Sequence, residues 1–120
     1  MKVKSLFRFD LFFIRVFKFY RLLSYLHLLK FLVRGIVPCF EHENTLKNLG
    51  KLGSLVDCGA NKGQFALMCY TLNKFKTYIA FDPILKPELF INFLKSRKVN
   101  TIYKKIALSN NKGESNFFIT

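Results

Sequence analysis

From Ser54 onward, short apolar runs alternate with longer stretches of helical spacing, a pattern that few folds accommodate. Three runs have the length of strands, at Ser54–Cys58, Thr77–Phe81 and Thr101–Leu108. Between them, apolar residues recur at helical spacing over 65–75 and 89–97, which is typical of amphipathic helices. Strands that alternate with helices form βαβ units and a parallel sheet. We therefore expect an α/β fold of order βαβαβ, a partial Rossmann-like sheet that is one half of a doubly wound fold.

Turn residues set the limits of these elements. Pro87 suits the first turn of the helix that follows the second run. Turn-forming residues at 110–113 follow the third run, so we expect residues 114–120 to return as the second strand of a C-terminal hairpin. Before the first run, the linker over 39–53 is more polar. Within it we expect a short helix from Glu43 to Leu49 that ends at Gly50.

Residues 1–38 are basic and rich in phenylalanine. Nearly every second residue from Leu6 to Arg34 is Phe, Leu, Ile, Val or Tyr. The Arg34–Gly35 pair is a typical helix stop, so the pattern predicts one long helix over Leu6–Arg34. A membrane span needs about 20 consecutive apolar residues, whereas charges interrupt this run and leave Leu22–Leu29 as its longest uncharged stretch. We expect neither a membrane span nor a signal peptide, since no small-residue cleavage site follows.

The charge of this helix and of the whole chain has several interpretations. The formal net charge is +13, which either attracts anionic surfaces such as phospholipid or only forms a solvated basic surface. The N-terminal helix can lie on an anionic membrane, with lysine and arginine reaching the phosphates, or it can dock on the rest of the protein or on a partner chain. We prefer the membrane surface. A nucleic-acid partner is not expected, because no basic-aromatic cluster stands apart from the core pattern.

The cysteines and histidines predict neither a disulfide framework nor a metal site. Cys39, Cys58 and Cys69 are odd in number and form no CxxC pair. We expect Cys58 and Cys69 to be small apolar residues of a protein in a reducing compartment, which indicates the cytoplasm or the inner face of its membrane. His27 and His42 have no ligand spacing to any cysteine, so no metal is expected.

The most informative motif joins the first strand to the first helix of the α/β region. The segment 56–64 passes from the strand through a glycine-containing turn into the helix. This places backbone N–H groups at the carboxyl end of a strand, where open α/β sheets bind ligands. Gly59 permits the tight turn, and Gly63 permits the helix to start close to the strand. Asp57 adds a carboxylate beside the ligand.

The residues of this turn favour a cationic ligand over a pyrophosphate. Dinucleotide sites have the spacing Gly-x-Gly-x-x-Gly, but Asn61 occupies the middle position and Asp57 repels a diphosphate. Neither objection applies to S-adenosylmethionine, which carries a sulfonium and an ammonium. Asp82, at the end of the second strand, can accept the hydroxyls of a ribose, although Asp82–Pro83 is also ordinary turn chemistry. The sequence thus predicts S-adenosylmethionine, with an NAD-type Rossmann module as an alternative.

Three strings of residues resemble the FkbM family of S-adenosylmethionine-dependent methyltransferases. They are Val-Asp-Cys-Gly-Ala-Asn-Lys-Gly-Gln-Phe, Ala-Phe-Asp-Pro and Ile-Ala-Leu-Ser-Asn-Asn-Lys-Gly-Glu. The resemblance covers roughly Leu55–Thr120 and implies a class I methyltransferase sheet. It also implies methylation of a hydroxyl group on a sugar, a glycolipid or a related natural product. Carried over by position, it implies that the methionine part of the cofactor meets Asp57, Gly59, Ala60, Asn61 and Gly63, the ribose meets Asp82, and the adenine lies near Ala107.

The resemblance also implies that this chain is only part of such an enzyme. The family orders its strands 3-2-1-4-5-7-6, so residues 54–120 would supply strands 3-2-1 and leave the first strand at an open edge. The family's Asp-x-Glu-Gly-type motif and its acceptor pocket would follow Thr120. We therefore expect a truncated cofactor-binding domain and assign no catalytic residue, because His27 falls in a helix and His42 in a linker. The alternative is a non-enzymatic remnant that associates with a membrane or a partner.

Overall fold

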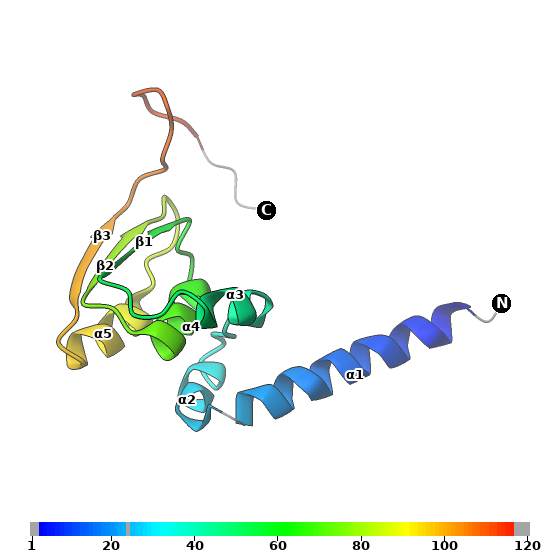
Figure 1. Cartoon of the computed structure of the whole chain (residues 1–120). Helices are drawn as coiled ribbons and strands as arrows, with labels where there is room; N and C mark the ends of the chain where they lie inside the picture. The colour runs from blue at the N-terminus through cyan, green and yellow to red at the C-terminus, as the bar shows by residue number, and fades with distance from the viewer. Residues whose placement is uncertain (1–2, 24, 117–120) are drawn as a thin grey trace. The chain divides into compact units, whose positions relative to one another are not determined.

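The structure, a computed structural model, describes residues 3–23 and 25–116, and of residues 3–10 and 22 it describes the backbone alone. The described part is mixed α/β, with a three-stranded parallel sheet, five α-helices and two short 3₁₀-helices (Figure 1). The chain forms two units, one of residues 1–50 with 63–74 and one of residues 51–62 with 75–120. We call the first the helical unit and the second the sheet unit. The expected division into 1–38, 39–53 and 54–120 stays a prediction.

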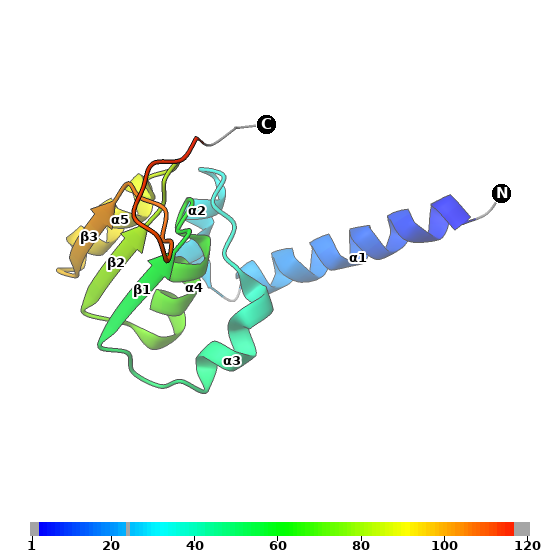
Figure 2. The ribbon, with the colours of Figure 1, turned by 90° about the horizontal axis from the view of Figure 1, so that it is seen from above.

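The sheet unit contains the parallel sheet that the sequence predicts. Its strands are β1 (Ser54–Cys58), β2 (Thr77–Phe81) and β3 (Asn100–Lys104). They pair in parallel in the order β1-β2-β3 (Figure 2). The bounds of β1 and β2 are those expected from the sequence. In the described residues no strand pairs with the outer edge of β1, which is the position expected for the first strand.

One face of this sheet packs against α5 (Glu88–Ser96), and the other face is exposed. Tyr78 of the central strand is fully buried, and its ring lies edge-on to that of Phe90, with centroids 5.3 Å apart. On the opposite face, Val56 is 55% exposed and Ile102 is 41% exposed. A doubly wound sheet carries helices on both faces. The α/β class and the parallel sheet are confirmed, while the sheet unit itself shows a helix on one face.

The third strand is shorter than expected. It ends at Lys104 instead of Leu108, and residues 105–116 form neither helix nor strand. The reason is the length of its neighbour, because Lys104 pairs with the last residue of β2 and no ladder partner follows it. The expected return strand of the hairpin is not formed over 114–116, and its remaining residues, 117–120, lie outside the described part.

The N-terminal helix is interrupted, so the prediction of one helix over Leu6–Arg34 is wrong. The helical elements of this unit are α1 (Val3–Leu23), a 3₁₀-helix at Leu26–Leu28, α2 (Leu29–Leu32), a second 3₁₀-helix at Phe40–His42, α3 (Glu43–Lys47) and α4 (Gln64–Asn73). After α1, Tyr25 has non-helical angles, φ −124° and ψ 68°. The break accompanies the burial of Leu28 and Phe31, which are 0% and 3% exposed.

The predicted helix stop at Gly35 is confirmed. Gly35 has φ +75°, and its N–H donates to the carbonyl of Leu32 at 2.9 Å, while Ile36 donates to Phe31 at 2.9 Å. These two bonds form a Schellman motif, which needs a residue in the left-handed region and favours glycine there. The short helix expected near Glu43 is also formed, as α3.

A buried carboxylate joins α1 to α3. Glu43 is 2% exposed. Its side chain accepts from Arg21 Nη1 at 3.0 and 3.2 Å, from Tyr25 Oη at 3.1 Å and from Lys47 Nζ at 2.6 Å. Burial acts to raise the pKa of Glu43, but the hydrogen bonds of Lys47 and Tyr25 and the charges of Arg21 and Lys47 outweigh it. The pKa therefore lies below its usual value.

Replacing Glu43 with glutamine should lower the free energy of unfolding by about 1–3 kcal/mol at pH 7, because Arg21 and Lys47 lose their shared anion. Urea titrations followed by helical circular dichroism measure this. A carboxylate with a lowered pKa stabilises the fold above its unfolded pKa of about 4.3 and loses that effect as the pH falls through the folded value. The difference from wild type should therefore shrink at pH 3.

Glu41→Gln is the matched control for this prediction. Glu41 pairs with Lys18 at 3.5 Å, but its side chain is 64% exposed, so its loss should cost less than about 0.5 kcal/mol. Equal effects of the two substitutions would show that the buried cluster does not hold α1.

Candidate functional site

The candidate site lies at the carboxyl ends of β1 and β2. Cys58 pairs with Phe81 in the parallel register, so the two strands end at the same edge of the sheet. The turn over 59–61 and the turn that begins at Asp82 leave this edge side by side. The sheet unit thus brings Asp57, Gly59, Ala60, Asn61 and Asp82 together.

The turn after β1 folds onto the end of β2. Gly59 has φ +79° and Asn61 has φ +49°, a left-handed angle that asparagine tolerates better than most residues. The N–H groups of Gly59 and Ala60 both donate to the carbonyl of Phe81, at 2.8 and 3.1 Å. These N–H groups therefore bind the neighbouring strand, whereas the sequence predicted that they would face a ligand.

Asp82 organises both turns. Its Oδ2 accepts from the N–H of Asn61 at 2.8 Å, and its Oδ1 accepts from the N–H groups of Ile84 and Leu85 at 2.8 and 2.7 Å. Burial acts to raise the pKa of Asp82, but these three bonds outweigh it and hold the pKa below its usual value. A carboxylate has about four lone-pair sites. Most of them are engaged here, so turn formation is the role that the geometry gives Asp82, with little capacity left for ribose hydroxyls.

The surroundings of Asp57 differ from those of Asp82. Asp57 is 8% exposed, and its Oδ2 accepts a hydrogen bond from Tyr78 Oη at 3.1 Å. Burial raises the pKa of Asp57, and the nearby charge of Asp82 raises it further, while the bond from Tyr78 lowers it only in part. A buried carboxylate near a second carboxylate favours the binding of a cation.

Two tyrosines support the site, and neither was predicted. Tyr78 lies behind Asp57, and Tyr103 Oη donates to the carbonyl of Asp82 at 2.9 Å. Burial and the charge of Asp82 raise the pKa of Tyr103. A signal was present in the sequence, because Tyr78 and Ala80 alternate with Ile79 on a strand, and a buried tyrosine needs a polar partner.

Gly63 and Ala107 are the two remaining residues that the sequence predicted to contact the cofactor. Gly63 belongs to the helical unit, where it is the N-cap of α4 with φ +82°. Ala107 lies in the irregular segment 105–116 and lines, with Pro83, an open cavity of about 850 Å³. Asp57, Asp82 and the turn 59–61 do not line that cavity.

The two cysteines that were expected to be small apolar residues differ in their exposure. Cys69 is 1% exposed, as expected, but Cys58 is exposed, so the prediction that it is a small core residue is wrong. The side chain of Cys58 lies on the uncovered face of the sheet, since it follows Val56 by two residues.

Among the residues whose side chains the structure describes, no group of three His, Cys, Asp or Glu side chains could hold a metal ion.

The glycine of the turn is required for its backbone angle. A Cβ added at Gly59 would meet no atom within 4 Å, so the positive φ, and not a steric clash, is what favours glycine there. Gly59→Ala should lower the free energy of unfolding by about 1 kcal/mol. Gly53 also has open space around it but no positive φ, so urea titration of Gly53→Ala should give a change below about 0.5 kcal/mol. Equal costs would contradict the backbone explanation.

No protein-family model, curated protein or solved structure matches this chain. Among residues 3–23 and 25–116, no helix combines the length and the apolar character needed to cross a membrane.

Proposed function

We propose that the sheet edge at the ends of β1 and β2 binds S-adenosylmethionine, and that the chain is the cofactor-binding part of a methyltransferase. The observation that supports this most is the environment of Asp57. Asp57 is buried, accepts a hydrogen bond from Tyr78 and lies near a second carboxylate, that of Asp82. Such a group is costly in the free protein and gains from a bound cation. The sulfonium and the ammonium of S-adenosylmethionine supply positive charge without a phosphate.

The residues present fit this cofactor in part. Asp57 offers the anionic group, and Gly59, Ala60 and Asn61 form a fixed turn beside it. Asp82 fits less well as a ribose ligand, because three N–H donors engage its oxygens. Its role in the proposal is to hold the turn 59–61 in place.

The reaction class follows from the cofactor and from the FkbM resemblance. S-adenosylmethionine supplies a methyl group bound to a positively charged sulfur, and the proposed acceptor is a hydroxyl group of a sugar, a glycolipid or a related natural product. Methyl transfer depends largely on the alignment of the acceptor oxygen with that carbon. We assign no catalytic base, since both histidines belong to the helical unit and the proposed cofactor site belongs to the sheet unit.

Isothermal titration calorimetry with S-adenosylmethionine, S-adenosylhomocysteine and NAD tests the proposal. We expect S-adenosylmethionine to bind more tightly than S-adenosylhomocysteine, which lacks the sulfonium charge that Asp57 would favour. NAD should not bind, because its pyrophosphate would approach two carboxylates. Binding of NAD alone would establish the NAD-type module instead, and binding of none of the three would overturn the cofactor site.

A second candidate function is contact of α1 with an anionic membrane surface. One stripe of α1 exposes large apolar side chains, between 43% and 69% of each, at Phe12, Val16, Phe19, Tyr20 and Leu23. A basic helix with such a stripe is suited to the membrane interface. Co-sedimentation of the full chain with vesicles containing phosphatidylglycerol should exceed that with phosphatidylcholine alone. Equal recovery with both would argue against it.

A further inference from the structure

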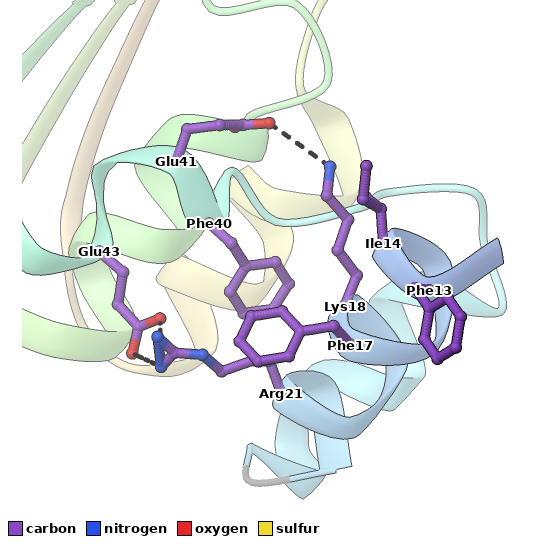
Figure 3. Close-up of a pocket in the computed structure, with 8 residues that line it drawn as sticks. All are labelled: Phe13, Ile14, Phe17, Lys18, Arg21, Phe40, Glu41 and Glu43. Carbon is purple, nitrogen blue, oxygen red and sulfur yellow. Dashed lines mark hydrogen bonds and ion pairs between the residues drawn. The ribbon is translucent and has the colours of Figure 1, made fainter. Parts of the chain in front are cut away.

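The face of α1 opposite that stripe borders a cavity. At about 3.6 residues per turn, positions 14, 17, 18 and 21 fall on the side of α1 away from positions 12, 16, 19 and 23. Positions 13 and 20, which are seven residues apart, lie next to each other where the two sides meet. The cavity has a volume of about 410 Å³ and lies within the helical unit (Figure 3). Its lining residues are Phe13, Ile14, Phe17, Lys18, Arg21, Phe40, Glu41 and Glu43. Ligand cavities in proteins are commonly about 300–1,000 Å³, so the space suits a small molecule.

The wall of this cavity is apolar and open to water. Phe13, Ile14 and Phe17 come from α1, and Phe40 comes from the 3₁₀-helix that precedes α3. Phe13 and Phe17 are each 60% exposed although they line a concave surface. Exposed aromatic surface of this kind gains free energy when an apolar chain covers it.

The rim carries two ion pairs whose cations stay accessible. Lys18 pairs with Glu41 at 3.5 Å, and Arg21 pairs with Glu43 at 3.0 Å, so that Phe17 and Phe40 lie between two ion pairs (Figure 3). Glu43 is shared with a third cation, Lys47, at 2.6 Å. Counting Lys47, which contacts Glu43 but does not line the cavity, three cations pair with two carboxylates here. The side chains of Lys18 and Arg21 are 47% and 34% exposed, which leaves them accessible to a further anion.

We infer that this cavity binds a single-chain anionic amphiphile of the fatty-acid class. Its acyl chain lies against Phe13, Phe17 and Phe40, and its carboxylate lies at the cationic rim beside Lys18 and Arg21. The site is independent of the cofactor site, which belongs to the sheet unit.

Calorimetry on the full chain with alkanoates of increasing length tests the apolar part of the inference. Each amphiphile is kept below its micelle-forming concentration. From hexanoate to decanoate, affinity should rise by up to about fourfold per added methylene that becomes buried, with one molecule bound per chain. Dodecanol and dodecyltrimethylammonium should bind at least about tenfold more weakly than dodecanoate.

Matched variants distinguish binding in the cavity from unspecific adsorption to α1. Phe17→Ser should weaken dodecanoate binding by about tenfold or more, whereas Phe12→Ser should change it less than about twofold. The two residues are nearly equally exposed, at 60% and 61%, but Phe12 does not line the cavity. Lys18→Gln should weaken the binding of dodecanoate about threefold and leave that of dodecanol unchanged.

Three outcomes would overturn the inference. Equal losses for Phe17→Ser and Phe12→Ser would show unspecific adsorption to α1. Equal affinity for the anionic and cationic amphiphiles would show that the charges of the rim do not contribute to binding. A chain that forms dimers in sedimentation and does not bind dodecanoate would show that a second copy covers the cavity.

Discussion

Replacing Asp82 with alanine should lower the free energy of unfolding by about 2–4 kcal/mol at pH 7. The substitution leaves the N–H groups of Asn61, Ile84 and Leu85 without their charged acceptor, and hydrogen bonds to a charged group are among the strongest in proteins. It also removes the side-chain hydrogen bond from Asn61 that links the turn after β1 to the turn after β2. Urea titration measures the loss, and amide hydrogen exchange should show it first at residues 59–61 and 84–85.

The pH dependence gives a second test of the same role. The pKa of Asp82 is lowered, so its stabilising effect is complete above the unfolded-state pKa, about 3.9, and is lost as the pH falls through the folded value. The difference between wild type and Asp82→Ala should therefore be full at pH 7 and shrink below about pH 4. Asp82→Asn, which keeps one acceptor oxygen, should cost about half as much. Glu88→Ala is a control, since Glu88 is 69% exposed and should cost less than about 0.5 kcal/mol. A similar cost for both would refute the role of Asp82.

Sequence reasoning located the sheet elements well because each depends on local pattern. The runs at 54–58 and 77–81 are apolar and flanked by glycine or Asp-Pro, and they are the strands that the structure contains. The end of β3 could not be predicted in the same way. It depends on where the neighbouring strand ends, which is information about pairing that residues 105–108 do not carry.

The interruption after α1 depends on tertiary contacts. The apolar pattern continues through Tyr25 and favours a continuous helix, but burial of Leu28 and Phe31 and the hydrogen bond from Tyr25 to Glu43 favour the bend. Helix propensity is a weak term beside such contacts.

Sequence reasoning predicted which residues meet at the sheet edge, but not what each one does there. The alternation of strands and turns was enough to bring Asp57, Asn61 and Asp82 to one edge. It assigned both carboxylates to the ligand, Asp57 to its methionine part and Asp82 to its ribose, with turn formation as the alternative for Asp82. Three backbone donors make one a structural group, and a single tyrosine leaves the other a buried anion. That distinction depends on side-chain hydrogen bonds between distant segments.

Asp57→Asn should change stability and ligand binding in opposite directions. Because the pKa of Asp57 is raised, its effect on stability is most favourable below the unfolded-state pKa and is lost as the pH rises through the folded value. At neutral pH the ionised group therefore costs stability. Asparagine keeps an acceptor for Tyr78 Oη without the charge, so the free energy of unfolding at pH 7 should rise by on the order of 1 kcal/mol. The gain should vanish below about pH 3.

The same substitution should weaken S-adenosylmethionine binding by about tenfold or more, since the anion that faces the sulfonium or ammonium is removed. It should affect S-adenosylhomocysteine less if the sulfonium is the partner. Glu88→Gln, an exposed acid replaced by its amide, should change neither quantity. A stabilised variant that loses the cofactor is expected of a residue retained for binding at a cost to the fold. If Asp57→Asn instead destabilises the chain and leaves binding unchanged, Asp57 is a structural residue and the cofactor belongs elsewhere.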